Sequence, residues 1–393
     1  MARLFLFLLF SLCCNYGFTQ SGERVKKIHS KAILVDAHND ILTTIATDSL
    51  NIETNLLGKT HSDIYRFAQG GVDVQIFSIW CDGKMQNPYQ WANREIDSLY
   101  AVAFRNPQQM QIAYSPNDIK KIVSQNKLAA IMGMEGGHMM EDDLNKLDSL
   151  YKRGVRYMTL TWNNSTSWAS SALDETTNRD STKQKGLTNF GKQIVSRMNE
   201  LGMMVDLSHV GEQTFWDAIN TTSKPVIVSH SCVHALCPVF RNLKDEQIKA
   251  VGKNGGVICL NFYSGFLDSN FNKRNAAFNE RHKAERDSIM KTVTDSYFAS
   301  DYMFKKYAAE VQELRAPLSL MLDHLDYLVK LAGINHVGLG SDFDGISSTP
   351  QSLDGVQDFP NFTEALFKRG YSKKSIRKIL GGNILRVFAA NSK

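Results

Sequence analysis

The stretch that decides the fold is residues 33–40, ILVDAHND, in which a short apolar run leads into a histidine and two acids. Seven similar runs follow along the chain. Most are continuously apolar rather than alternating, which is typical of parallel strands covered on both faces. The eight runs are Ile33–Val35, Val74–Trp80, Leu128–Met134, Val155–Leu160, Met203–Leu207, Val226–Ser229, Gly256–Phe262 and Val337–Gly340.

Helical patterns lie between these runs. Residues Leu187–Leu201 predict a helix, with Thr188 as its N-cap and Gly202 at the left-handed position that ends it. Further helices are expected at Lys244–Val251 and Ala316–Ala332. Eight alternations of strand and helix predict an α/β protein, a closed (β/α)8 TIM barrel.

The interval between Phe262 and the last run is far longer than an ordinary connection. Its part Asn270–Leu314 is rich in charged and aromatic residues. We interpret it as a helical insertion before the last strand, packed over the barrel mouth; a plain surface excursion is the alternative. After the last run, Ser372–Ala390 predicts one more amphipathic helix.

The N-terminus is unlike the rest of the chain. Leu4–Cys14 is an apolar run too short to span a membrane, and Gly17–Thr19 offers small residues before a cut. Residues 1–19 are therefore predicted to be a signal peptide of an exported protein, periplasmic or secreted. A lipid anchor on Cys13 or Cys14 is the less favoured alternative.

The composition is that of an ordinary globular enzyme, with 393 residues, 43% hydrophobic, 22% charged and a net charge of +5. Lysine and arginine are scattered, so nothing predicts a nucleic-acid partner. No linker, repeat or further apolar span interrupts 20–393, which we expect to form a single barrel domain without an integral membrane segment. Cys81, Cys232, Cys237 and Cys259 either form disulfides or remain buried thiols.

Residues that commonly bind metals lie at the carboxyl ends of five runs. They are His38 and Asp40 at the first run, Glu135 at the third, His209 at the fifth, His230 at the sixth and Asp342 at the eighth. In a barrel these ends converge on one mouth. Three histidines with two carboxylates suit zinc, and five ligands exceed the need of one catalytic ion. The pattern therefore predicts two zinc ions that share a bridging carboxylate.

The motifs around these residues resemble a known family. They are VDAHND at 35–40, GMEGG at 133–137, VDLSH at 205–209, VSHS at 228–231, the pair Arg241-Asn242, GLGSDFDG at 338–345 and GGNILRVF at 381–388. With them, the chain resembles the renal (membrane) dipeptidase family of barrel-fold amidohydrolases from about Lys27 to the C-terminus. GSDFDG together with an early H-x-D is the specific part of this resemblance.

The resemblance implies a role for each metal-type residue. His38 and Asp40 would bind one zinc ion, and His209 and His230 the other. Glu135 would bridge the two ions and count among the catalytic residues. The resemblance also implies a homodimer.

The resemblance implies substrate contacts as well. Asp342 would be the catalytic acid and base that also meets the substrate amine, and Arg241 would hold the C-terminal carboxylate of a dipeptide. Many relatives carry a histidine after the fourth run, where this chain has Trp162. Asn163 is then a candidate donor to the substrate carbonyl, and Tyr263 a further pocket residue.

The function expected from these features is a zinc-dependent dipeptidase acting through a hydroxide that bridges the two metals. Acceptance of a D-residue at the C-terminal position is left open. One alternative is a related binuclear amidohydrolase that acts on N-acyl amino acids or lactams. Another is a non-catalytic exported binding protein, for which one of the six residues should be lost, yet all six are present.

Overall fold

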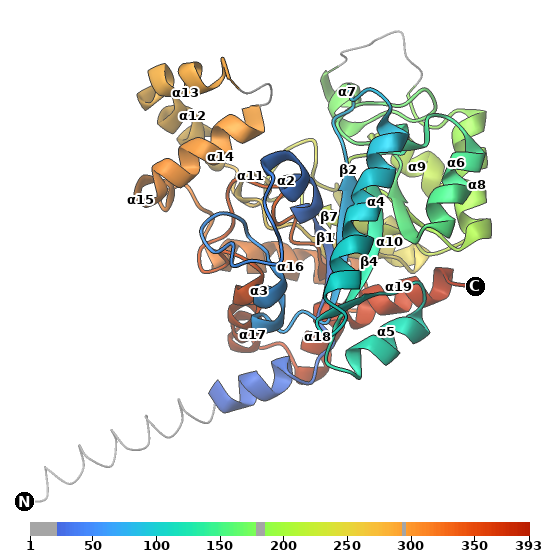
Figure 1. Ribbon diagram of the computed structural model, residues 1–393, viewed down its shortest axis with the longest axis horizontal. Helices are drawn as coiled ribbons and strands as arrows, with labels where there is room; N and C mark the ends of the chain where they lie inside the picture. The colour runs from blue at the N-terminus through green and yellow to red at the C-terminus, as the bar shows by residue number, and fades with distance from the viewer. Residues whose placement is uncertain (1–21, 178–184, 293–295) are drawn as a thin grey trace, which may run out of the picture.

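Eight parallel strands close into a barrel, as predicted (Figure 1). The computed structural model describes residues 22–177, 185–292 and 296–393, so the predicted signal peptide 1–19 lies outside the described residues. The ring closes because β2 pairs with both β1 and β4, and β9 pairs with β1 and β8. The strands of the ring are β1 (Val35–Asn39), β2 (Val74–Trp80), β4 (Leu128–Glu135), β5 (Val155–Thr159), β6 (Met204–Asp206), β7 (Ile227–Ser231), β8 (Val257–Leu260) and β9 (Val337–Leu339).

The strand boundaries differ from the predicted runs at one place that matters. The first run was expected to end at Val35, but β1 begins there and continues to Asn39, so His38 lies within the strand. A ninth strand, β3 (Met110–Ile112), was not predicted. It pairs only with the beginning of β4, and its three residues are too few for a recognisable apolar run.

Helices surround the barrel (Figure 1). The predicted caps of α8 are confirmed: the Thr188 hydroxyl accepts from the amide of Gly191 at 3.2 Å, and Gly202 has φ +87°. The helices outside the insertion are 22–29, α2 (Ile41–Asp48), α3 (Ile64–Gln69), α4 (Pro88–Arg105), α5 (Pro116–Val123), α6 (Leu144–Lys152), α7 (Ala172–Thr177), α8 (Asn189–Leu201), α9 (Glu212–Thr221), α10 (Asp245–Asn254), α11 (Ser264–Leu267), α16 (Leu318–Ala332), α17 (Phe359–Lys368), α18 (Lys373–Arg377) and α19 (Asn383–Asn391).

The insertion before the last strand is helical, as expected. It consists of α12 (Phe271–Arg281), α13 (Lys283–Ile289), α14 (Ser296–Lys306) and α15 (Ala308–Val311). Figure 1 shows these helices in orange, set apart from the helical layer around the strands. They enclose a small apolar cluster of their own that includes Phe271, Phe278 and Met303. The insertion reaches the barrel mouth, because Ser300 lines the cavity there.

The C-terminal segment closes the end of the barrel opposite the mouth. Ile384, Val387 and Phe388 of α19 pack with residues of the strands, in a cluster separate from the main core. The single helix predicted for Ser372–Ala390 is interrupted by a π-type turn between α18 and α19. A Cβ on Gly381 in this turn would lie 2.3 Å from the carbonyl oxygen of Ile33, so only glycine permits the approach.

The described residues also show the state of the cysteines and the character of the helices. The four cysteines there are buried free thiols. None of the helices described has both the length and the apolar character that crossing a bilayer requires.

Candidate metal centre and its pocket

The predicted metal residues converge at the barrel mouth. His38 lies in β1, Glu135 ends β4, and His230 lies in β7, whereas Asp40 and His209 stand just beyond β1 and β6. All five are buried. With Asp342 they form three overlapping groups, and within each group the possible ligand atoms lie within 4.8 Å of one another. The clusters are therefore suited to hold metal ions.

Glu135 occupies the centre of this arrangement. Its Oε2 lies 3.3 Å from Nε2 of His38, while its Oε1 lies 2.8 Å from Nε2 of His209 and 3.3 Å from Nε2 of His230. On the first side, Nε2 of His38 is also 3.4 Å from Oδ2 of Asp40. The two carboxylate oxygens thus face two different sets of ligand atoms.

The other ring nitrogens of two histidines are tied to the protein. Nδ1 of His38 lies 2.7 Å from the hydroxyl of Tyr157, which itself donates to the carbonyl oxygen of Ala37 at 3.1 Å. Nδ1 of His209 lies 3.1 Å from the side-chain oxygen of Asn163. Both Nδ1 atoms therefore donate, which leaves Nε2 of each neutral ring with a lone pair that faces Glu135.

His230 is held through a longer relay. Its Nδ1 lies 2.8 Å from the Ser229 hydroxyl, which donates to Oδ2 of Asp206 at 2.6 Å. Asp206 is fully buried and also accepts from the Thr159 hydroxyl at 2.5 Å and from the amide of Ser208 at 3.1 Å. This relay fixes the same tautomer in His230, with its Nε2 lone pair toward Glu135.

These donors fit a metal cation. Nε2 of His38 and Oδ1 of Asp40 are buried without a hydrogen-bond partner in the structure. The Nε2 atoms of His209 and His230 lie only 3.0 Å apart, although the tautomers above leave no proton between them. Buried lone pairs that converge in this way suit a metal cation.

The pKa shifts agree with ligand behaviour on one side of the cluster. Burial and the charge of Arg241 lower the pKa of His209 to about 4, and burial holds the pKa of His230 well below its ordinary value. Burial also disfavours charge on His38, but Tyr157, Asp40 and Glu135 outweigh it and raise the His38 pKa.

Asp342 lies beside the cluster in a left-handed backbone conformation, with φ +61°. Its Oδ2 accepts from the side-chain amide of Asn261 at 2.8 Å. Burial, together with the charge of Asp40, raises the pKa of Asp342 well above its ordinary value. The space around this carboxyl is tight, since a Cβ on Gly345 would lie 2.7 Å from its Oδ1 and 2.2 Å from Oδ2 of Asp40.

A cavity of about 500 Å³ opens onto the cluster, and the structure brings all the predicted substrate residues to it. They are Trp162, Asn163, Arg241, Tyr263 and Asp342. Arg241 is buried, with Nη2 donating to the carbonyl oxygen of His230 at 3.2 Å and its guanidinium 5.4 Å from the ring centre of Phe266. Its Nε is buried without a partner in the structure. The side-chain oxygen of Asn163 accepts a hydrogen bond from Nδ1 of His209, so Asn163 orients this histidine.

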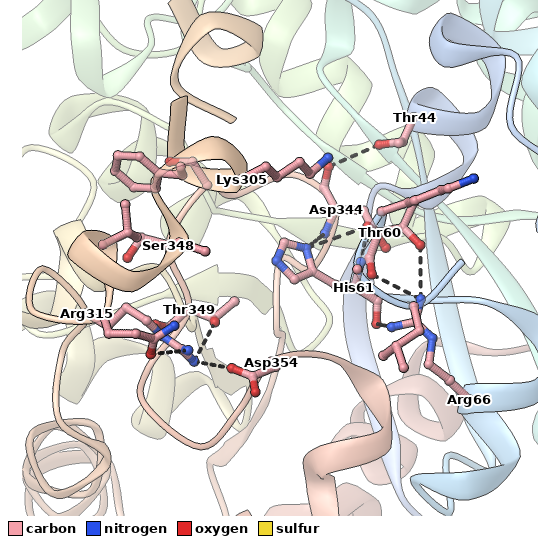
Figure 2. A pocket seen from close by; sticks show the side chains of 18 of the residues that line it. Thr44, Thr60, His61, Arg66, Lys305, Arg315, Asp344, Ser348, Thr349 and Asp354 are labelled. Carbon is pink, nitrogen blue, oxygen red and sulfur yellow. Dashed lines mark hydrogen bonds and ion pairs between the residues drawn. The ribbon is translucent and has the colours of Figure 1, made fainter. Parts of the chain in front are cut away.

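A second cavity, of about 390 Å³, adjoins the first through Thr44, Asp344 and Ser347. Figure 2 shows that hydrogen bonds and ion pairs join many of the polar side chains that line this cavity. Nε of Arg315 donates to the carbonyl oxygen of Thr349 at 3.0 Å. Nδ1 of His61 accepts from the amide of Asp344 at 2.9 Å. These contacts hold loops that line the second cavity.

Sequence reasoning missed the residues that stand behind the site. Tyr157 and Asp206 orient histidines, and Asn261 orients Asp342. Asp206 and Asn261 are polar residues at the ends of apolar runs, a signal that could have drawn attention to them. Tyr157 lies inside the run Val155–Leu160, where nothing in the local pattern distinguishes it from a core residue.

A parallel barrel with a buried histidine–carboxylate cluster at its mouth defines the class: an α/β barrel with a candidate metal centre. Comparison with known families gives the same answer. The model of the membrane dipeptidase family, peptidase family M19, matches residues 22–393. The chain belongs to this family.

Three individual proteins similar to this chain share between 22% and 30% sequence identity with it. Dipeptidase 3 of Macaca fascicularis is 30% identical over 361 residues, which are 90% of this chain and 64% of that protein; the chain thus spans about 64% of the relative's length. The probable dipeptidase PvdM from Pseudomonas aeruginosa shares the fold, with a TM-score of 0.74, 23% identity and coverage of 95% of this chain and 98% of that one. So does a metallo peptidase from Rhodobacter sphaeroides liganded with a phosphinate mimic of the dipeptide L-Ala-D-Ala, with a TM-score of 0.73, 22% identity and coverage of 92% and 100%.

Proposed function

We propose that this protein is a dipeptidase that holds two zinc ions. His38 and Asp40 would bind one ion, His209 and His230 the other, and Glu135 would bridge them. The observation that carries the proposal is the position of the Glu135 carboxylate, with Oε2 toward the first set and Oε1 toward the second. The three Nε2 lone pairs described above support it.

The reaction proposed is hydrolysis of a peptide bond. Zinc in such a site supplies Lewis acidity and lowers the pKa of water. Asp342 accepts the proton released as water attacks the peptide carbonyl and passes it to the leaving amine. Its raised pKa suits this exchange, and the Asn261 amide holds its carboxyl in place.

The substrate proposed is a dipeptide. Arg241 would bind the C-terminal carboxylate, and Asp342 would face the substrate amine. A buried guanidinium with an unused Nε donor supports the first contact. A cavity of about 500 Å³ lies within the range of small-molecule sites. The phosphinate dipeptide mimic bound by the Rhodobacter sphaeroides protein supports the same substrate class.

The test combines metal analysis of purified protein with hydrolysis of L,L and L,D dipeptides, before and after treatment with a chelator. We expect about two zinc ions per chain and activity that chelation removes and zinc restores. Turnover of N-acyl amino acids or lactams without turnover of any dipeptide would favour the related amidohydrolase reaction instead.

Export and dimerisation are proposed on separate grounds. Residues 1–19 support export, and the family resemblance supports a homodimer. Mass spectrometry of the mature protein from its native host should find an N-terminus at Gln20, and sedimentation should give the mass of two chains. An uncleaved N-terminus or a monomer would contradict the respective proposal.

A further inference from the structure

We propose that Trp80 and Trp162 form an apolar wall that selects dipeptides with a large apolar side chain, aromatic side chains above all. This inference rests on the proposed dipeptidase function and adds its substrate class. Trp80 was recognised in the sequence only as the end of a strand. The structure assigns it to the cavity, together with Trp162.

The two rings make one continuous surface. Their centroids lie 5.1 Å apart with an interplanar angle of 68°, an edge-to-face contact. The Trp162 ring lies 6.4 Å from the ring of His209, so the surface begins beside the metal cluster. Both tryptophans are only half-buried, which leaves aromatic surface facing the cavity.

The backbone of Trp80 is firmly held from behind. Its amide donates to Oε2 of Glu95 at 2.8 Å, and its carbonyl oxygen accepts from the indole nitrogen of Trp91 at 2.9 Å. Glu95 is itself buried and bonded to the hydroxyl of Thr43 at 2.9 Å. A wall fixed before the ligand arrives loses little conformational entropy on binding.

Trp162 is held by close packing. A Cβ on Gly136 would lie 3.4 Å from the Cβ of Trp162, and Gly136 has φ +115°, which side chains rarely adopt. The glycine after Glu135 leaves room chiefly for the ring of His138, whose Cε1 a Cβ there would meet at 2.5 Å, and Trp162 lies in ordinary contact beside it.

The wall lies across the mouth from the residues proposed to hold the ends of the substrate. Around the ring the strands follow the order β1, β2, β4, β5, β6, β7, β8, β9. Trp80 ends β2 and Trp162 follows β5, on either side of β4. Arg241 and Asp342 follow β7 and β9, on either side of β8, which stands opposite β4. We infer that a dipeptide held at both ends by the second pair can turn its side chains toward the first pair.

We expect a preference for large apolar side chains, because a larger group covers apolar surface that a methyl group leaves exposed to water. Covering it with a phenyl ring contributes enough to change kcat/KM by at least about tenfold. A methyl group covers less of this surface, and a carboxylate loses hydration there without gaining a partner in the rings.

The experiment compares kcat/KM of the zinc-loaded protein on Ala-Ala, Ala-Phe, Phe-Ala and Ala-Glu. We expect at least one phenylalanine dipeptide to exceed Ala-Ala by about tenfold or more. Trp162→Ala and Trp80→Ala should lower kcat/KM more for that phenylalanine dipeptide than for Ala-Ala, so that the ratio falls close to one, and Trp162→Phe should keep most of it. Trp216→Ala, on α9 and outside the cavity, is the matched control and should leave the ratio unchanged.

Zinc content and melting temperature identify a variant that has failed to fold, and the comparison of the four dipeptides on the unsubstituted protein then decides the question. Equal kcat/KM on all four dipeptides, or a ratio that survives both alanine substitutions, overturns the aromatic wall and leaves the dipeptidase proposal intact. Absence of turnover on every dipeptide overturns the proposed function itself.

Discussion

The hydroxyl of Tyr157 lies 2.7 Å from Nδ1 of His38, deep inside the barrel, and Tyr157 does not line the cavity at the metal cluster. Partners of this kind orient a ligand histidine and raise its basicity, and their loss typically weakens metal binding about 10–100-fold. We expect Tyr157→Phe to lower zinc affinity by that factor, measured by competition with a chelator. Tyr327→Phe, whose hydroxyl bonds to Asp245 on the outer helices, is the control. Equal affinity in the two variants would show that this contact does not matter to the metal.

Asp342→Asn separates metal binding from catalysis. The amide keeps the size of the carboxyl but cannot exchange a proton, so we expect kcat to fall about 10²–10⁴-fold with the zinc content unchanged. Metal analysis and steady-state kinetics on one preparation check both statements. An unchanged kcat would remove Asp342 from the mechanism.

Arg241→Ala tests recognition of the substrate carboxylate. We expect KM for dipeptides to rise by at least about thirtyfold, because a buried charge contact is lost. C-terminally amidated dipeptides, which carry no carboxylate, should be affected much less. The assignment fails if both substrate series lose the same factor.

Gly345→Ala tests the close approach of backbone and carboxylates. The added Cβ would lie 2.2 Å from Oδ2 of Asp40, so either the loop or the carboxylate must move. We expect zinc binding to weaken by at least about tenfold, as expected when ligand geometry is disturbed. Gly22→Ala, where a Cβ meets nothing within 4 Å, is the matched control. Retention of both ions at normal affinity would contradict the tight packing described here.

Glu95 predicts a pH dependence of stability in the metal-free protein. Burial raises the pKa of this carboxyl to about 8. Its folded pKa thus exceeds its unfolded value, so its contribution to stability is present below about pH 4.5 and is lost as the pH rises toward 8. The melting temperature of wild type should fall over this interval relative to Glu95→Gln. Parallel curves for the two proteins would place the Glu95 pKa at an ordinary value.

The barrel and the metal cluster could be predicted from the sequence for one physical reason. Buried parallel strands are continuous apolar runs, and the fold brings their carboxyl ends together. His38, Glu135 and His230 could therefore be grouped without knowledge of any contact. The three-residue β3 escaped because it is too short to carry a pattern.

What stands behind the ligands could not be predicted in this way. Tyr157 and His38 are 119 positions apart, and their contact depends on how two strands pack across the interior. The helix is interrupted at Gly381, where a side chain would collide with the carbonyl oxygen of Ile33 just before β1. No local helical pattern reveals this contact. His61 is half-buried against Asp344, a contact that its local sequence does not indicate.

The insertion α12–α15 keeps most of its apolar side chains for itself, in a cluster apart from those of the barrel. This cluster meets the main core at Tyr263, whose ring centre lies 5.5 Å from that of Phe271. Through Ser300 the insertion also contributes to the rim of the cavity. We therefore expect changes in this module to act on the rim of the cavity, whereas the histidines lie on strands that the module does not supply.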